Sequence, residues 1–308
     1  MLAASVGSSA GAPPSSGGSV VVPLHVERGR YGETHLGIDV MIGERTARVV
    51  FDTGSTGLRV LASAAGTVRR TTRGVVGRFD SGLALSGREA MASFAIGTAR
   101  SKTTTSLELI DSYGCTPQSP SCPFAKRRRP AMFGAPFAGI LGVNRIDPPS
   151  GRCCPNPLRG LAGGLGLRYI VHANAAAPTL TLGAKLASPS GYTMLDVPRG
   201  MAPRGCIRLS TASNDVCGDV VFDTASPDFA ITTTGAAVEA PLPPGTTATL
   251  TIGPWMYAFT LGNGTRLSAF VRRGNRSRIV VGLAELQSVD VFYDLDAGRI
   301  GLSAPLSP

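Results

Sequence analysis

One seven-residue segment occurs twice in this chain, and this repeat restricts the possible folds more than any other feature. Val49–Ser55 reads VVFDTGS and Val220–Ser226 reads VVFDTAS, so six of the seven residues match at a distance of 171 positions. Each copy places an aspartate directly after an apolar run, where a carboxylate is unstable unless it is hydrogen-bonded or protonated. The repeat predicts two carboxyl groups that meet across a pseudo-twofold axis. Such a pair shares a proton, so one group can act as a base and the other as an acid on a water molecule.

A shorter repeat follows each copy of the first. Gly142 ends the triplet Ile140-Leu141-Gly142, 90 positions after Asp52, and Gly282 ends the triplet Val280-Val281-Gly282, 59 positions after Asp223. With these motifs in this order, the chain resembles the pepsin-like aspartic proteases. The resemblance runs from about Val20 to Ala304 and includes the segments Pro136–Gly142 and Asp290–Asp296.

The resemblance implies an all-β, bilobal acid protease fold, with two β-barrel-like lobes and a cleft between them. Residues 20–190 would form the N-terminal lobe with the first Asp motif and the flap. Residues 191–308 would form a shortened C-terminal lobe with the second motif, and residues 1–19, rich in Ser, Gly, Ala and Pro, a flexible tail. Composition independently favours a mostly β protein, because short apolar runs are separated by many of the 39 glycines and 23 prolines.

Individual elements can also be predicted. The apolar runs predict strands at Ala47–Asp52, Ser93–Ile96, Pro178–Leu182, Ala248–Ile252 and Asp290–Asp294. The resemblance implies one short helix at about Leu283–Ser288.

The resemblance also assigns roles to residues of the two motifs. Asp52 and Asp223 would be the catalytic pair that holds and activates a water molecule. The supporting residues would be Thr53, Gly54 and Ser55 in the first motif and Thr224, Ala225 and Ser226 in the second. The two serines would hydrogen-bond the outer carboxylate oxygens, and the two threonines would cross-link the loops through hydroxyl-to-backbone bonds. This chemistry requires no cofactor and no metal ion.

Three positions depart from the family pattern. Ala225 replaces the glycine of the second motif, where a methyl group can crowd the carboxylate. The flap lacks its usual tyrosine, since none occurs between Tyr31 and Tyr113, and the flap candidate is Phe79-Asp80-Ser81-Gly82. Arg59 stands where the family has a tryptophan, and it would place a cation near the edge of the cleft.

Three functions are therefore open. The retained Asp, Thr and Ser pairs favour an active endopeptidase with a divergent flap. The departures favour a catalytically silent homologue that binds a protein partner in the cleft. A binder of anionic surfaces would use the net charge of +10 but would leave the Asp repeat unexplained.

Charge and hydropathy indicate the partners. The positive charge is scattered except at Lys126–Arg129, and no aromatic residues alternate with that run, so nucleic acid is not an expected partner. No apolar stretch reaches 18 residues, and no membrane span is expected. The resemblance implies a monomer that acts on polypeptide substrates.

The six cysteines favour disulfide bonds. Cys115 with Cys122 and Cys206 with Cys217 would each close a short loop, whereas the partners of Cys153 and Cys154 remain open. A secreted protein or another oxidising compartment is favoured, although no signal peptide is visible.

Overall fold

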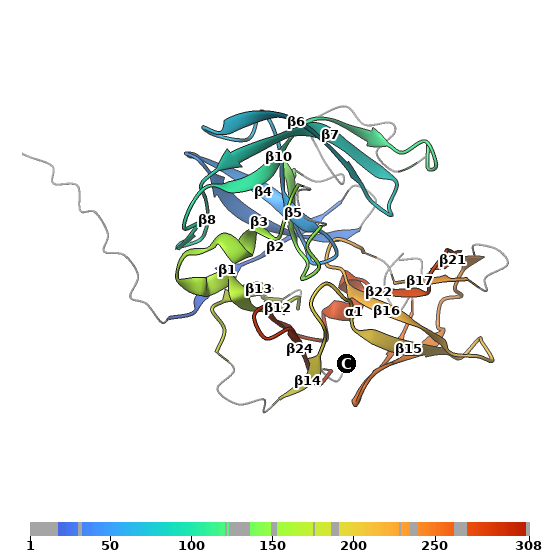
Figure 1. Cartoon of the computed structure of the whole chain (residues 1–308). Coiled ribbons are helices and arrows are strands. Elements are labelled where there is room, and N and C mark those ends of the chain that lie inside the picture. Colours follow the sequence, from blue (N-terminus) through green and yellow to red (C-terminus); the bar gives the residue numbers. More distant parts are fainter. Residues whose placement is uncertain are drawn as a thin grey trace, which may run out of the picture.

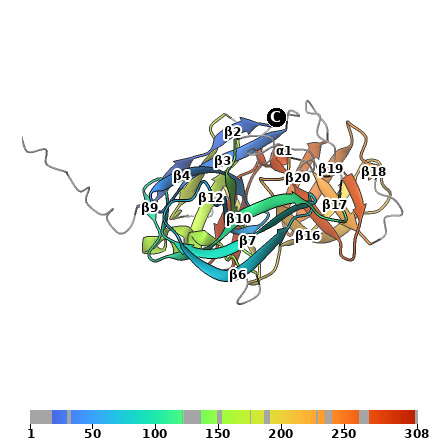
Figure 2. The ribbon, with the colours of Figure 1, turned by 90° about the horizontal axis from the view of Figure 1, so that it is seen from above.

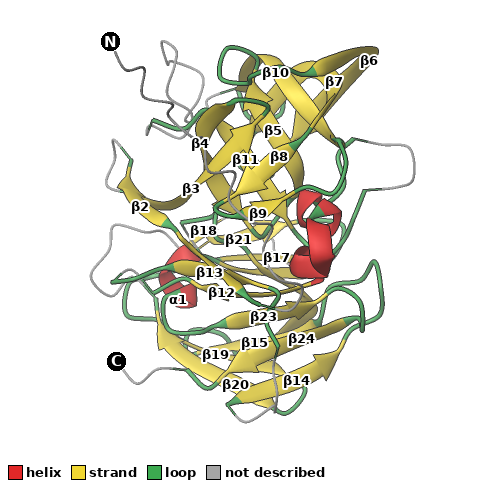
Figure 3. Cartoon of the chain, turned by 90° about the vertical axis from the view of Figure 1, so that its left-hand side faces the viewer, coloured by secondary structure: helices red, strands yellow, loops and turns green. Residues whose placement is uncertain are grey.

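Strands make up most of the computed structural model, and its helices are few and short (Figure 3). The structure describes residues 18–29, 33–120, 122, 136–148, 153–174, 176–185, 191–227, 229–234, 240–261 and 270–305. The predicted all-β class is therefore confirmed. Most of the predicted tail, residues 1–17, and the basic run Lys126–Arg129 lie outside the described residues.

The five strands predicted from the apolar runs and the one helix implied by the resemblance are confirmed to within two residues at each end. They are the strands β4 (Arg45–Asp52), β8 (Phe94–Ile96), β13 (Thr179–Leu182), β19 (Thr247–Ile252) and β23 (Val291–Asp294), and the helix α1 (Leu283–Leu286). Two short 3₁₀ helices, η1 (Pro157–Gly160) and η2 (Ala162–Leu167), precede β12.

The strands form three sheets. The ten-stranded sheet has the order β6-β7-β10-β5-β11-β4-β3-β8-β9, with β2 also paired to β3. Its remaining strands are β2 (His25–Arg28), β3 (Thr34–Ile42), β5 (Thr56–Leu61), β6 (Arg69–Arg78), β7 (Leu83–Ala92), β9 (Ala99–Arg100), β10 (Thr105–Cys115) and β11 (Gly139–Val143).

The eight-stranded sheet has the order β18-β21-β17-β22-β16-β15-β19-β20. Its other members are β15 (Arg204–Leu209), β16 (Val216–Phe222), β17 (Ala230–Thr233), β18 (Ala240–Pro241), β20 (Trp255–Thr260), β21 (Phe270–Arg273) and β22 (Arg278–Val281). In Figure 1 the blue to green strands β4, β6, β7 and β10 lie at the top, and the orange strands β15–β17 lie at the lower right. Figure 2 shows the same separation from above, with β2–β4 on one side and β17–β19 on the other.

The six-stranded sheet has the order β1-β13-β12-β23-β24-β14. It contains β1 (Val20–Pro23), β12 (Arg168–His172), β14 (Tyr192–Asp196) and β24 (Arg299–Ser303) besides β13 and β23. Three of its strands precede the expected boundary at residues 190/191 and three follow it. The boundary therefore separates the ten-stranded from the eight-stranded sheet. The six-stranded sheet, however, contains strands from both sides of the boundary.

The two motif aspartates lie at the ends of central strands, and the three residues before each aspartate are apolar and buried. Val49, Val50 and Phe51 are each 0% exposed on β4, and Val220–Phe222 are buried on β16. Continuous burial without alternation is typical of a strand covered on both faces. Each motif strand has a parallel neighbour that carries the matching triplet: β11 beside β4, with Gly142 opposite Asp52, and β22 beside β16.

No helix among the described residues is long and apolar enough to cross a membrane.

Candidate active site

The two Asp loops are joined by a reciprocal set of hydrogen bonds between their threonines. The amide of Thr53 donates to Oγ1 of Thr224 at 3.1 Å, and the amide of Thr224 donates to Oγ1 of Thr53 at 3.1 Å. The Thr53 hydroxyl donates to the Phe222 carbonyl at 2.6 Å, and the Thr224 hydroxyl donates to the Phe51 carbonyl at 2.7 Å. Both threonines are buried, so these bonds are shielded from water and fix the two loops relative to each other.

Asp52 is held by three donors from its own loop. Its Oδ1 accepts from the amides of Gly54 at 2.7 Å and Ser55 at 3.1 Å, and its Oδ2 accepts from the Ser55 hydroxyl. Burial raises the pKa of Asp52, while the Ser55 hydroxyl, the two amides and the charge of Arg59 oppose that rise. Of the two aspartates, Asp52 has the environment that better stabilises a carboxylate.

Asp223 occupies the matching place in the second loop. Its Oδ1 accepts from the amides of Ala225 at 2.9 Å and Ser226 at 3.0 Å. Burial and then the nearby charge of Asp52 raise the pKa of Asp223 to about 7. The hydrogen bond expected from the Ser226 hydroxyl stays a prediction.

The Asp223 carboxyl lies against the backbone of the first loop. A Cβ atom placed on Gly54 would lie 2.5 Å from Oδ2 and 2.7 Å from Oδ1 of Asp223. The first motif therefore requires glycine at this position. The second motif tolerates Ala225, which packs against an apolar cluster that contains Val50 and Phe137. Phe79 packs against the same cluster.

The predicted flap residues form the turn of the β6–β7 hairpin. The Phe79 amide donates to Leu83 O, and the Gly82 amide donates to Phe79 O, both at 2.9 Å. Gly82 has a φ of +83°, a conformation that favours glycine. Asp80 forms an ion pair at 2.5 Å with Arg278 of β22, which connects this turn to the eight-stranded sheet. Ser81 lies in the turn, with its hydroxyl 3.5 Å from the Leu83 amide.

Arg59 does not lie at an exposed edge, which corrects the sequence expectation for its charge. It is 9% exposed, and its Nε lies 3.1 Å from Oε2 of Glu108, a side chain with no exposed surface. Its guanidinium also donates to the Thr56 carbonyl and lies 5.5 Å from the centre of the Phe79 ring. Burial lowers the pKa of Arg59, while the charges of Glu108 and Asp52 oppose that change. Arg59 therefore supports the first loop and the hairpin from inside.

Sequence reasoning missed Glu108, Asn144 and Arg278. Glu108 had a usable signal, because a carboxylate between Leu107 and Leu109 interrupts an apolar run. Asn144 follows the first triplet, and its side-chain amide donates to the Gly54 carbonyl at 3.2 Å. Arg278 carries no comparable signal.

The structure places three cysteine pairs at disulfide distance. Cys115–Cys122 and Cys206–Cys217 confirm the two predicted loops. The third pair joins the neighbours Cys153 and Cys154, whose partners the sequence left open.

No known protein family matches this chain, and no curated protein matches it either.

Proposed function

We propose that this chain is an aspartic-type endopeptidase of the pepsin-like kind, with Asp52 and Asp223 as its catalytic pair. The observation that carries the proposal is the placement of the Asp223 carboxyl against Gly54 of the Asp52 loop, with both loops held by reciprocal threonine bonds. Two carboxyl groups this close, in a buried setting, share one proton at moderately acid pH.

In this proposal the ten-stranded and eight-stranded sheets form two lobes, and a polypeptide lies in a cleft between them, above the carboxyl pair. The Phe79–Gly82 turn serves as the flap. Its Phe79 ring supplies apolar cover without the hydroxyl of a tyrosine, so turnover on generic substrates is expected to be weak.

The environments of the two carboxyl groups assign their roles. Asp52, with its three hydrogen-bond donors, is the ionised group and accepts a proton from the bound water. The oxygen of that water attacks the scissile carbonyl carbon, and Asp223 donates its proton to the carbonyl oxygen. Asp52 then gives the proton that it took from water to the leaving amine, and Asp223 takes back a proton from one hydroxyl of the intermediate. The C–N bond breaks, and the two product chains are released.

The pKa values predict an acid optimum. Activity declines as pH rises through about 7, because Asp223 then loses the proton that it must donate. Activity also declines in strong acid, where Asp52 takes up a proton. A bell-shaped profile is the expected result.

The test is cleavage of an unfolded protein at about pH 3 to 6, with and without pepstatin. Asp52→Asn and Asp223→Asn should each abolish cleavage and leave the circular dichroism spectrum unchanged. Asp215→Asn is the matched control, since Asp215 is paired with Arg208 on the eight-stranded sheet and is expected to leave cleavage intact. Near-normal turnover in either variant of the pair would show that the assignment is wrong.

One observation favours the alternative of a silent homologue. The flap turn carries no tyrosine and is tied by Asp80 to Arg278, a contact that restrains its opening. A chain that binds pepstatin but cleaves nothing across this pH range would be a binding protein that retains the carboxyl pair.

A further inference from the structure

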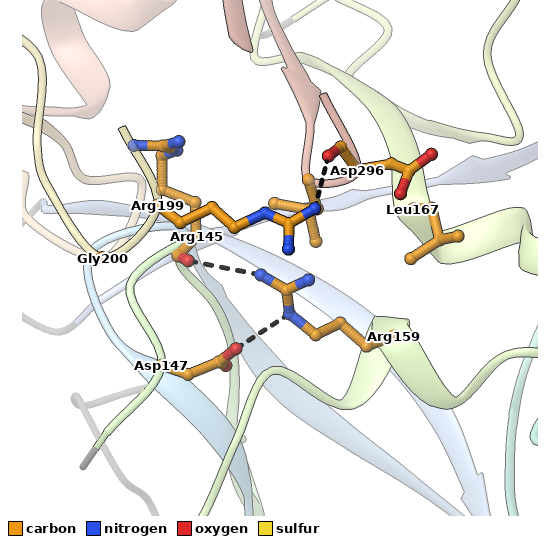
Figure 4. A pocket seen from close by; sticks show the side chains of 8 residues that line it. Arg145, Asp147, Arg159, Leu167, Arg199, Gly200 and Asp296 are labelled. Carbon is orange, nitrogen blue, oxygen red and sulfur yellow. Dashed lines mark hydrogen bonds and ion pairs between the residues drawn. The ribbon is translucent and has the colours of Figure 1, made fainter. Parts of the chain in front are cut away.

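One pocket lies apart from the two Asp loops, and no residue of those loops lines it. It has a volume of about 440 Å³, within the range of small-molecule sites. Its wall contains three arginines, two aspartates and the leucines Leu167 and Leu295 (Figure 4). The arginines outnumber the carboxylates, so the lining carries a formal excess of one positive charge.

Arg145 supplies a buried cation at this wall. It is 7% exposed, and its guanidinium donates to main-chain carbonyls of Val197, Pro198 and Met201. Its buried Nε has no hydrogen-bond partner among the described residues. Burial lowers the pKa of Arg145, while Tyr293 and Tyr169 oppose that change. Arg145 therefore adds to the positive potential of the pocket.

Arg159 and Arg199 bring two further guanidinium groups to the same space. Arg159 pairs with Asp147 at 2.9 Å, and Arg199 donates to the main-chain carbonyl of Asp296 at 2.8 Å. Figure 4 shows these two guanidinium groups close together, with Asp147 on the far side of Arg159. Like charges repel at short range, so this arrangement favours an anion between or beside them.

We infer that this pocket binds a small molecule that carries an oxyanion, either a phosphate or a carboxylate. Guanidinium groups present paired N–H donors that match the oxygens of both. Arg199 is exposed and can adjust its side chain to the ligand, while Leu167 and Leu295 offer apolar surface to the rest of the molecule. The inference does not depend on the proposed peptidase activity.

The test uses inorganic phosphate and malonate as separate probes at constant ionic strength, with chloride as the reference salt. Thermal unfolding is followed for the whole chain. A probe at tenfold its Kd should raise Tm by about 2 °C. A rise with phosphate alone identifies a phosphoryl ligand, a rise with malonate alone identifies a carboxylate, and a rise with both identifies a general oxyanion site.

Three variants separate this pocket from the general positive charge of the chain and from the carboxyl pair. Arg199→Gln should lose the rise, measured against its own Tm in chloride. Arg208→Gln removes an equal charge from an exposed pair on the eight-stranded sheet and should keep the rise. Asp52→Asn should also keep it, because the carboxyl pair takes no part. An equal rise in Arg199→Gln and in the unchanged chain, or no rise with either probe, would overturn the inference.

Discussion

Replacing Arg59 with methionine is expected to destabilise the fold strongly, because it leaves the Glu108 carboxylate buried without a cation. The two charged groups lie 3.1 Å apart and the Glu108 side chain has no exposed surface. At that distance their attraction is about 5 kcal/mol for an effective dielectric constant of about 20. Loss of one partner from a buried pair typically costs about 3–5 kcal/mol, which is a large share of the total stability of a domain.

A double-mutant cycle separates the ion pair from general packing. Glu108→Leu alone leaves the Arg59 cation without its carboxylate and should also be strongly destabilising. Arg59→Met combined with Glu108→Leu removes both charges and should recover most of the lost stability, since apolar replacements of buried pairs are often neutral. Urea denaturation followed by circular dichroism gives the free energies of unfolding.

The loss of unfolding free energy in Arg59→Met should also depend on pH. Burial raises the pKa of Glu108, and Arg59 opposes that rise, so the pKa rises further when Arg59 is removed. A carboxyl whose folded-state pKa exceeds its unfolded value stabilises the fold below the unfolded pKa, and this contribution is lost as pH rises through the folded pKa. The variant should therefore lose less stability at about pH 4 than at about pH 7. An equal loss at both pH values, or a loss below about 1 kcal/mol at pH 7, would refute the reasoning.

Four further predictions concern the carboxyl pair and the hairpin turn. Gly54→Ala should cost about 1–3 kcal/mol and lower turnover, because its Cβ would overlap the Asp223 carboxyl. Ala225→Gly should raise turnover or leave it unchanged, and a large loss would show that the alanine is adapted to this site. Because the pKa of Asp223 is raised to about 7, the free energy of unfolding should decrease from about pH 4 to 7, and Asp223→Asn should flatten that dependence. If the free energy of unfolding depends on pH equally in Asp223→Asn and in the unchanged chain, Asp223 is not the group responsible. Asp80→Asn should speed hydrogen exchange at the turn by weakening its tie to Arg278, and unaltered exchange there would argue against a restraining pair.

The site could be predicted from sequence where a feature occurs twice. The repeat of Asp, Thr and Ser at equal spacing predicts that Thr53 and Thr224 face each other, and the structure contains their bonds. The triplets also repeat in the same order after each Asp motif, and the structure pairs β11 with β4 and β22 with β16. Because an Asp motif and a triplet occur in the same order in each half of the chain, each triplet is matched with the Asp motif that precedes it.

Contacts that occur once could not be placed in this way. The burial of Arg59 could not be predicted, because its partner, Glu108, lies on a different strand that no motif connects to it. The contact of Asp80 with Arg278 joins residues 198 positions apart, and neither residue stands out in its own segment. Charged side chains that pair across a fold have no periodic pattern, so their partners become visible only when the strands are assembled.

The six-stranded sheet contains strands that lie far apart in the sequence, and this affects the order in which the chain can fold. β12 pairs with β23, and Arg168 bonds Asp294 at a separation of 126 residues, so this sheet cannot close until nearly the whole chain has been synthesised. Contacts of such long range form slowly, and the strands that wait for them remain open to wrong partners. The apolar residues Ile170 and Val171 of β12 are therefore exposed on the nascent chain until β23 arrives, which makes this sheet the step at which assembly is most easily diverted into aggregation.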